Sequence, residues 1–122
     1  MFRGGVFTIY VNDMNRSVQF YTETLGMKLT QRHGDNWALI DGGPGLSIGL
    51  HPATPEIPAG RRGSIAIGLY LERPIKDAVE QLRNAGVAFD GPIKEDVALS
   101  LAFFSDPDGT SLYLAEMKPA YR

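Results

Sequence analysis

The sequence predicts an α+β fold made of two modules, each with the order β-α-β-β-β. Two helical segments end at glycines, Gly26 and Gly86, and each lies between one strand-like segment and several more. The segments WALIDGGPGLSIGL and LAFFSDPDGTSLYL also align without a gap, with Gly49 falling on Tyr113. A repeat of roughly 60 residues in so short a chain indicates two related modules.

The first module is expected to span residues 1–51. Asp13 is suited to cap a helix, because its carboxylate can accept free amide protons of the first turn, and Met14, Val18 and Tyr21 then recur at helical spacing. Turn-rich pieces separate the strand-like segments. The strands of this module are expected at residues 6–11, 27–33, 37–41 and 46–51.

The second module is expected to span residues 64–116. A proline near its start and Gly86 at its end bound a helix over residues 74–85. The proline-rich segment 52–63 is expected to be a linker. The strands of the second module are expected at residues 64–71, 87–89, 97–104 and 110–116.

The composition favours one soluble domain over residues 1–122 that holds both modules. The chain has 122 residues, 43% of them hydrophobic, and no long apolar run. Its net charge of -2 gives no electrostatic basis for binding nucleic acid. No signal-peptide pattern opens the chain, so we expect a cytoplasmic protein without a membrane partner.

The stretch SDPDGT places two aspartates, Asp106 and Asp108, around a proline. They could form a metal site or an acid-base pair. The order Asp-Pro-Asp-Gly is, however, what a tight turn favours, because proline presets the backbone angle and aspartate bonds nearby amides. We therefore interpret both aspartates as turn formers.

Alternation along four predicted strands separates two faces. One face is large and apolar, as a face covered by helices requires. The other face is small, polar or aromatic, which fits either a ligand cleft or an ordinary solvated or subunit-facing surface. The apolar set is Phe7, Ile9, Val11, Leu46, Ile48, Leu50, Ile65, Ile67, Leu69, Leu112 and Leu114.

The run IYVNDMNRSVQFYTETLGMKL, together with LRNAGV and FFSDPDGTSLYL, resembles the vicinal oxygen chelate superfamily. This group includes glyoxalase I, extradiol dioxygenases and bleomycin-resistance proteins. The resemblance implies paired modules whose mixed sheets curl into clefts, and often a homodimer. It also implies metal ligands at four positions, which in this chain are Val6, Gly49, Ser64 and Tyr113. None of the four is a histidine or a carboxylate, so no metal site and no cofactor is expected.

These observations favour a metal-independent protein that binds a small planar or aromatic ligand, similar in action to bleomycin-resistance proteins. Tyrosines would give flat contact surfaces, polar side chains would orient the ligand, and Gly49 and Gly68 would leave room for it. Trp37 and Phe104 are further stacking candidates, although the facing of their strands is ambiguous. The candidate ligand-binding residues are Thr8, Tyr10, Trp37, Gly49, His51, Ser64, Gly68, Tyr70, Phe104 and Tyr113.

Two alternatives remain open. One is an enzyme of the same fold, either a lyase or dioxygenase with displaced metal ligands such as His51 and a loop carboxylate, or a metal-free isomerase with His51 and Tyr113 as acid and base. The other is a non-catalytic dimer that buries the second face against its partner.

Overall fold

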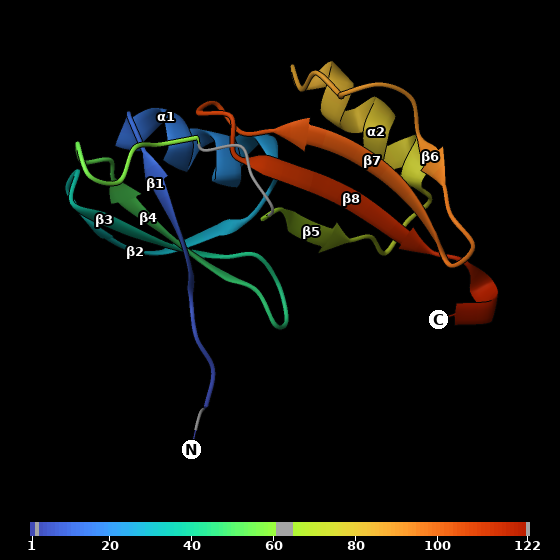
Figure 1. Ribbon diagram of the computed structural model, residues 1–122, viewed down its shortest axis with the longest axis horizontal. Coiled ribbons are helices and arrows are strands. Elements are labelled where there is room, and N and C mark those ends of the chain that lie inside the picture. Colours follow the sequence, from blue (N-terminus) through green and yellow to red (C-terminus); the bar gives the residue numbers. More distant parts are fainter. Residues whose placement is uncertain (2, 61–64, 122) are drawn as a thin grey trace. The chain divides into compact units, whose positions relative to one another are not determined.

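The computed structural model describes residues 1, 3–60 and 65–121, and the chain divides into two compact units (Figure 1). The first unit is Met1–Arg61 together with Pro107–Gly109, and the second is Arg62–Asp106 together with Thr110–Arg122. Each unit contains one four-stranded mixed sheet. The predicted fold class of two β-α-β-β-β modules is thereby confirmed.

The sheet of the first unit has the strand order β1-β4-β3-β2. Strand β1 pairs with β4 in parallel, and the other pairs are antiparallel. Because the first and last strands of the module are parallel neighbours, their carboxyl ends meet where the helix begins. The elements are β1 (Phe7–Val11), α1 (Met14–Gln19), η1 (Phe20–Thr24), β2 (Lys28–His33), β3 (Trp37–Asp41) and β4 (Ser47–Pro52).

Helix α1 begins and ends as its sequence indicates. The Asp13 carboxylate accepts a hydrogen bond from the amide of Arg16 at 3.1 Å, which satisfies a first-turn donor. After Gln19 the helix widens into the π-helical turn η1, where the amide of Leu25 donates to the carbonyl of Phe20 at 2.9 Å. Gly26 ends it with a φ of 77°, a backbone conformation that favours glycine.

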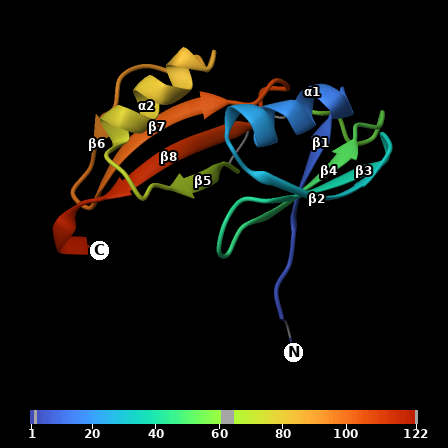
Figure 2. The ribbon, with the colours of Figure 1, turned by 180° about the vertical axis from the view of Figure 1, so that it is seen from behind.

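The second unit repeats the topology, with the strand order β5-β8-β7-β6 and a parallel pair formed by β5 and β8. Helix α2 lies over β7 and β8 in both views of the ribbon (Figures 1 and 2). The elements are β5 (Ile67–Tyr70), α2 (Ile75–Asn84), β6 (Lys94–Glu95), β7 (Leu99–Ser105), β8 (Ser111–Met117) and η2 (Pro119–Tyr121).

One predicted strand, at residues 87–89, is wrong. Only Phe89 makes an isolated bridge there, to Phe104, and the edge strand is β6, at Lys94–Glu95. The physical reason is the Asp-Gly-Pro sequence that follows Phe89, because a proline cannot donate to a ladder and Gly91 has a φ of 91°. Strand β4 also continues to Pro52, one residue past the expected module boundary.

The core of each unit lies between its sheet and its helix. Most of the apolar set predicted from alternation is buried, including Ile48 and Leu50 in the first unit and Leu112 in the second. Four members are not buried: Phe7 and Ile65 are exposed, at 40% and 66%, and Leu46 and Leu69 are partly exposed. Phe7 opens an edge strand and Ile65 precedes β5, so neither is packed between two neighbouring strands. No helix among the described residues has the length and apolar character needed to cross a membrane.

Candidate functional site

The face of the second sheet that is turned away from α2, here called the helix-free face, carries most of its aromatic side chains. Cross-strand pairing places Gly68 beside Tyr113 and Tyr113 beside Phe103. Residues two apart on a strand share a face, so Tyr70 and Leu101 lie on this face as well. The sheet itself therefore aligns one row of residues across three strands: Gly68, Tyr113 and Phe103.

The rings in this row are in contact. The Tyr113 phenol covers Gly68 so closely that a methyl group built on Gly68 would lie 2.5 Å from the ring. The ring centroids of Phe103 and Tyr113 are 5.4 Å apart with an interplanar angle of 43°. This spacing is within the range of favourable aromatic pairs. The ammonium of Lys94 lies 5.4 Å from the Phe103 centroid and extends the row to the edge strand β6.

The first unit has a comparable helix-free face. The Trp37 ring covers Gly49, and both residues are at least half-buried. Tyr10 and His51 are register partners on β1 and β4, with ring centroids 5.1 Å apart. The Nδ1 atom of His51 is also 2.8 Å from the carbonyl oxygen of Pro52, which leaves Nε2 as the ring nitrogen available to another partner.

The sequence suggested that Gly49 and Gly68 leave empty space for a ligand, but the structure shows that they do not. In each unit an aromatic ring fills the volume next to the glycine: Trp37 over Gly49 and Tyr113 over Gly68. The absence of a Cβ atom is what lets each ring approach the backbone so closely. The glycines therefore support the rings, and a ligand on either face would meet the ring surfaces.

Phe104 is not on the helix-free face, which corrects its place among the candidate residues. It is 1% exposed, pairs with the core residue Leu112, and lies with its ring centroid 5.4 Å from that of Phe89. The residue on the helix-free face is its neighbour Phe103, which sequence reasoning missed. The hairpin register could have revealed it, because pairing Ser105 with Ser111 across the turn places Phe103 opposite Tyr113.

The other candidates divide between the two units. Thr8, Tyr10, Trp37, Gly49 and His51 share the helix-free face of the first sheet, and Gly68, Tyr70 and Tyr113 share that of the second. Tyr70 is 78% exposed at the edge strand β5. Ser64 lies outside the described residues. His33 pairs with Trp37 and so joins the first face, which the sequence did not suggest.

Of the four positions at which the family resemblance implies metal ligands, the three that the structure describes contain no histidine or carboxylate. Val6 is exposed ahead of β1, Gly49 lies beneath Trp37, and the Tyr113 ring rests on Gly68. Within the described part of the chain, no group of three or more histidines and carboxylates is placed to hold a metal ion. A protein metal site needs several such donors, so the described residues do not fit one.

Asp108 has a structural role that the sequence did not reveal. Asp106 closes the β7–β8 hairpin, with its carboxylate accepting from the Thr110 amide at 2.8 Å, as a turn former should. The Asp108 side chain instead lies fully buried in the first unit. Its carboxylate accepts from Arg16 Nη2 at 3.0 Å, Ser17 Oγ at 3.3 Å and the Asn12 amide at 3.3 Å.

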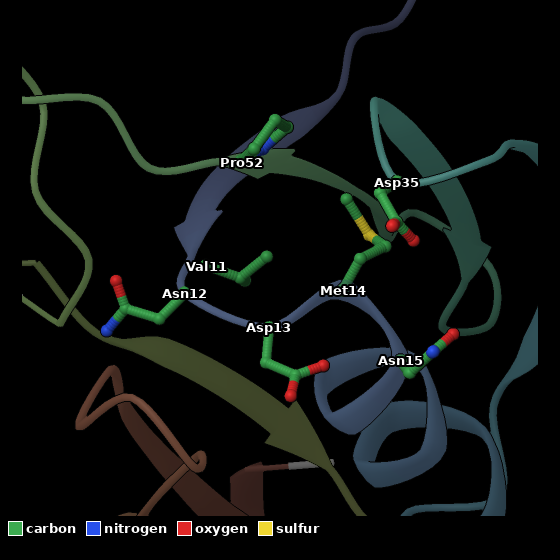
Figure 3. A pocket seen from close by; sticks show the side chains of 7 residues that line it. All are labelled: Val11, Asn12, Asp13, Met14, Asn15, Asp35 and Pro52. Carbon is green, nitrogen blue, oxygen red and sulfur yellow. The ribbon is translucent and has the colours of Figure 1, made fainter.

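A shallow pocket of about 260 Å³ lies elsewhere, where β1 and β4 end and α1 begins (Figure 3). Its polar groups serve the local fold: Asp13 caps α1, and Arg32 bonds both Asp35 and Asn15. A pocket of about 480 Å³ occupies the equivalent place in the second unit, where Glu116 accepts from the Ile75 amide at 3.0 Å. Because both modules contain it, this hollow is a feature of the strand-to-helix connection.

The paired modules agree with comparison to known families. The model of the Glyoxalase/Bleomycin resistance protein/Dioxygenase superfamily matches residues 5–114. The chain belongs to this superfamily. Among its relatives is virulence protein STM3117 of Salmonella typhimurium, 26% identical over 112 residues that cover 87% of this chain and 78% of that protein.

Solved structures of this superfamily have the same fold. TnmS3, an antibiotic binding protein from Streptomyces sp. CB03234, is 28% identical, with a TM-score of 0.80 over 97% of this chain and 98% of that one. A glyoxalase/bleomycin resistance protein from the same organism is 30% identical, with a TM-score of 0.73 over 92% of this chain and 98% of that one.

Proposed function

We propose that this protein binds a small planar molecule on the helix-free face of its second unit, without a metal ion and without chemical change to the ligand. The observation that carries this proposal is the Tyr113 ring, seated on Gly68 and flanked by Phe103, at a position where metal-dependent relatives hold a ligand to the metal.

Aromatic side chains fixed in this way suit a planar ligand. A tyrosine or phenylalanine ring offers a large apolar surface and has only two side-chain torsions to fix on binding. The backbone of Gly68 supports the Tyr113 ring from below, and Phe103 restrains it from the side. Little further order has to be imposed when a ligand stacks on the pair, and preorganisation of this kind raises affinity.

The relatives support the same class of function. TnmS3, which shares the fold over nearly the whole of both chains, is described as an antibiotic binding protein. Sequestration needs a complementary surface and no catalytic group. In the first unit, Tyr10, Trp37 and His51 form a second aromatic surface of the same kind, which we propose as an additional contact region.

A thermal-shift screen with planar aromatic antibiotics and metabolites tests this proposal. A ligand at 100 times its dissociation constant should stabilise the fold by about 2.7 kcal/mol. Replacing Tyr113 with Ala should remove the shift, whereas the matched control Tyr121→Ala, in η2, should leave it unchanged. A shift that survives Tyr113→Ala would place the site elsewhere.

Elemental analysis with a chelator tests the independence from metal. We expect no stoichiometric divalent metal in the purified protein, and equal ligand affinity with and without the chelator. Stoichiometric metal whose removal abolishes ligand binding or an enzymatic activity would overturn the proposal.

A further inference from the structure

Lys94 is the charged end of the aromatic row on the second unit. It lies on the edge strand β6, paired with Leu101, so its side chain shares the helix-free face with Phe103 and Tyr113. Its ammonium is 5.4 Å from the Phe103 centroid, a distance typical of a cation–π contact. A cation held there lies beside the surface on which a planar ligand would stack.

The ammonium of Lys94 has no carboxylate partner among the described residues. Its neighbour Glu95 belongs to a different network, in which Ser100 Oγ donates to Oε2 at 2.7 Å and Lys118 Nζ lies 3.5 Å from the same oxygen. The amide of Asp90 donates to the Phe103 carbonyl at 2.7 Å, but the described residues show no ion pair between Asp90 and Lys94.

The rest of the row is uncharged. The described residues around Phe103 and Tyr113 on this face are Gly68, Tyr70, Leu101, Ser105, Ser111 and Ala115. An anionic group placed beside the rings would therefore meet the ammonium of Lys94. None of the described strand residues on this face carries a carboxylate that could pair with a cationic group.

We infer that the ligand of this face is a planar aromatic acid, stacked on Phe103 and Tyr113 with its anionic substituent bound by Lys94. This inference rests on the proposed binding function and adds the charge of the ligand and the residue that selects it. Because Lys94 is exposed, its ion pair with the ligand would be screened by water, and a preference of roughly two- to fivefold is expected.

Calorimetry with a naphthoate and the matching naphthamide tests this preference, because the two probes share a ring and differ in charge. The acid should bind roughly two- to fivefold more tightly than the amide. In Lys94→Met, which keeps an apolar chain over Phe103, the ratio of the two affinities should fall toward one, and Lys94→Arg should restore it. Lys28→Met, an exposed lysine of the first unit, should keep the wild-type ratio.

Two further arms complete the test. Raising the salt concentration should reduce the acid's advantage in the wild type but not in Lys94→Met, and Asp90→Asn should increase it. Equal affinities for acid and amide in the wild type, or a ratio unaffected by Lys94→Met, would overturn the inference while the binding function stands. If neither probe binds, the acid is not the ligand, and the screen with other planar molecules decides the binding function separately.

Discussion

The phenol ring of Tyr113 lies directly on the backbone of Gly68, its partner across the parallel pair β5–β8, with no space between them for a methyl group. A glycine on one strand thus sets the height and tilt of a ring on the next. This relationship connects a single residue choice in the sequence to the shape of the proposed ligand surface.

Replacing Gly68 with Ala should therefore move the Tyr113 ring away from the strand. A Cβ atom at Gly68 would come 2.5 Å from the ring, too close for the ring to keep its place. We expect a loss of stability of about 1–3 kcal/mol, as for other overpacked sites, and weaker ligand binding. Urea unfolding and the thermal-shift assay measure the two effects. Binding and stability both equal to wild type would show that the ring is not held by Gly68.

Asp108→Ala should destabilise the protein by about 1–3 kcal/mol. The substitution leaves the fully buried hydroxyl of Ser17 and the amide of Asn12 without their acceptor, whereas the half-exposed Arg16 can return to water. Arg16→Met should accordingly cost less, at most about 1 kcal/mol.

Asp35→Ala is the matched control for Asp108→Ala, because it breaks an exposed ion pair. Asp35 pairs with Arg32, and the Asp35 side chain is 83% exposed. Its effect on the free energy of unfolding should be close to zero. Equal losses for the Asp35 and Asp108 variants, measured by urea unfolding, would contradict the buried role of Asp108.

Glu95 should give the stability a small dependence on acid pH. The hydroxyl of Ser100, and next the ammonium of Lys118, hold the pKa of Glu95 below its ordinary value by favouring the carboxylate. A lowered pKa in the folded state stabilises the fold at pH values above the unfolded-state pKa, and this contribution is lost as the pH falls through the folded-state pKa.

Urea midpoints of the wild type and Glu95→Gln between about pH 2 and pH 7 measure this dependence. The difference between the two proteins should be present at neutral pH and vanish at the acid end. Ser100→Ala should remove most of it, because the hydroxyl is the largest cause. A difference that stays constant with pH would contradict this assignment.

We expect the protein to form a homodimer in solution, and Tyr70→Lys to weaken it. Tyr70 and Ile65 are large apolar side chains that are 78% and 66% exposed in the single chain, within or just before the edge strand β5. We attribute their exposure to a surface that a second copy of the chain covers. Light scattering after size exclusion reports the mass. A wild-type protein that stays monomeric at high concentration would contradict the expectation.

Much of the fold could be predicted because its signals are local. The Asp13 cap, the glycines at positions 26 and 86, and the alternation in β4 and β8 each act within a few residues, and the structure contains the helices and strands they indicate. The edge strand β6 has two residues, too few for a periodic pattern to be visible. The sequence of segment 87–89 resembles a strand more than that of β6 does, yet the segment makes only one isolated bridge, from Phe89 to Phe104.

The candidate site was predictable only in part, because a site depends on register. Alternation placed Tyr113 and Gly68 on one face correctly. It could not decide between Phe103 and Phe104, since shifting a strand by one residue exchanges its two faces. It also could not show that the rings of Trp37 and Tyr113 cover the glycines, because that contact joins residues on different strands.

The sequence by itself thus determined the repeated β-α-β-β-β order, the helix ends and the absence of strong metal donors at four family positions, since these depend on residue type and local spacing. The tertiary structure decided which rings face the same side, what fills the space above Gly49 and Gly68, and that Asp108 binds Arg16 from 92 residues away. Those properties arise from pairing between strands and packing between distant segments, and local sequence does not encode either one alone.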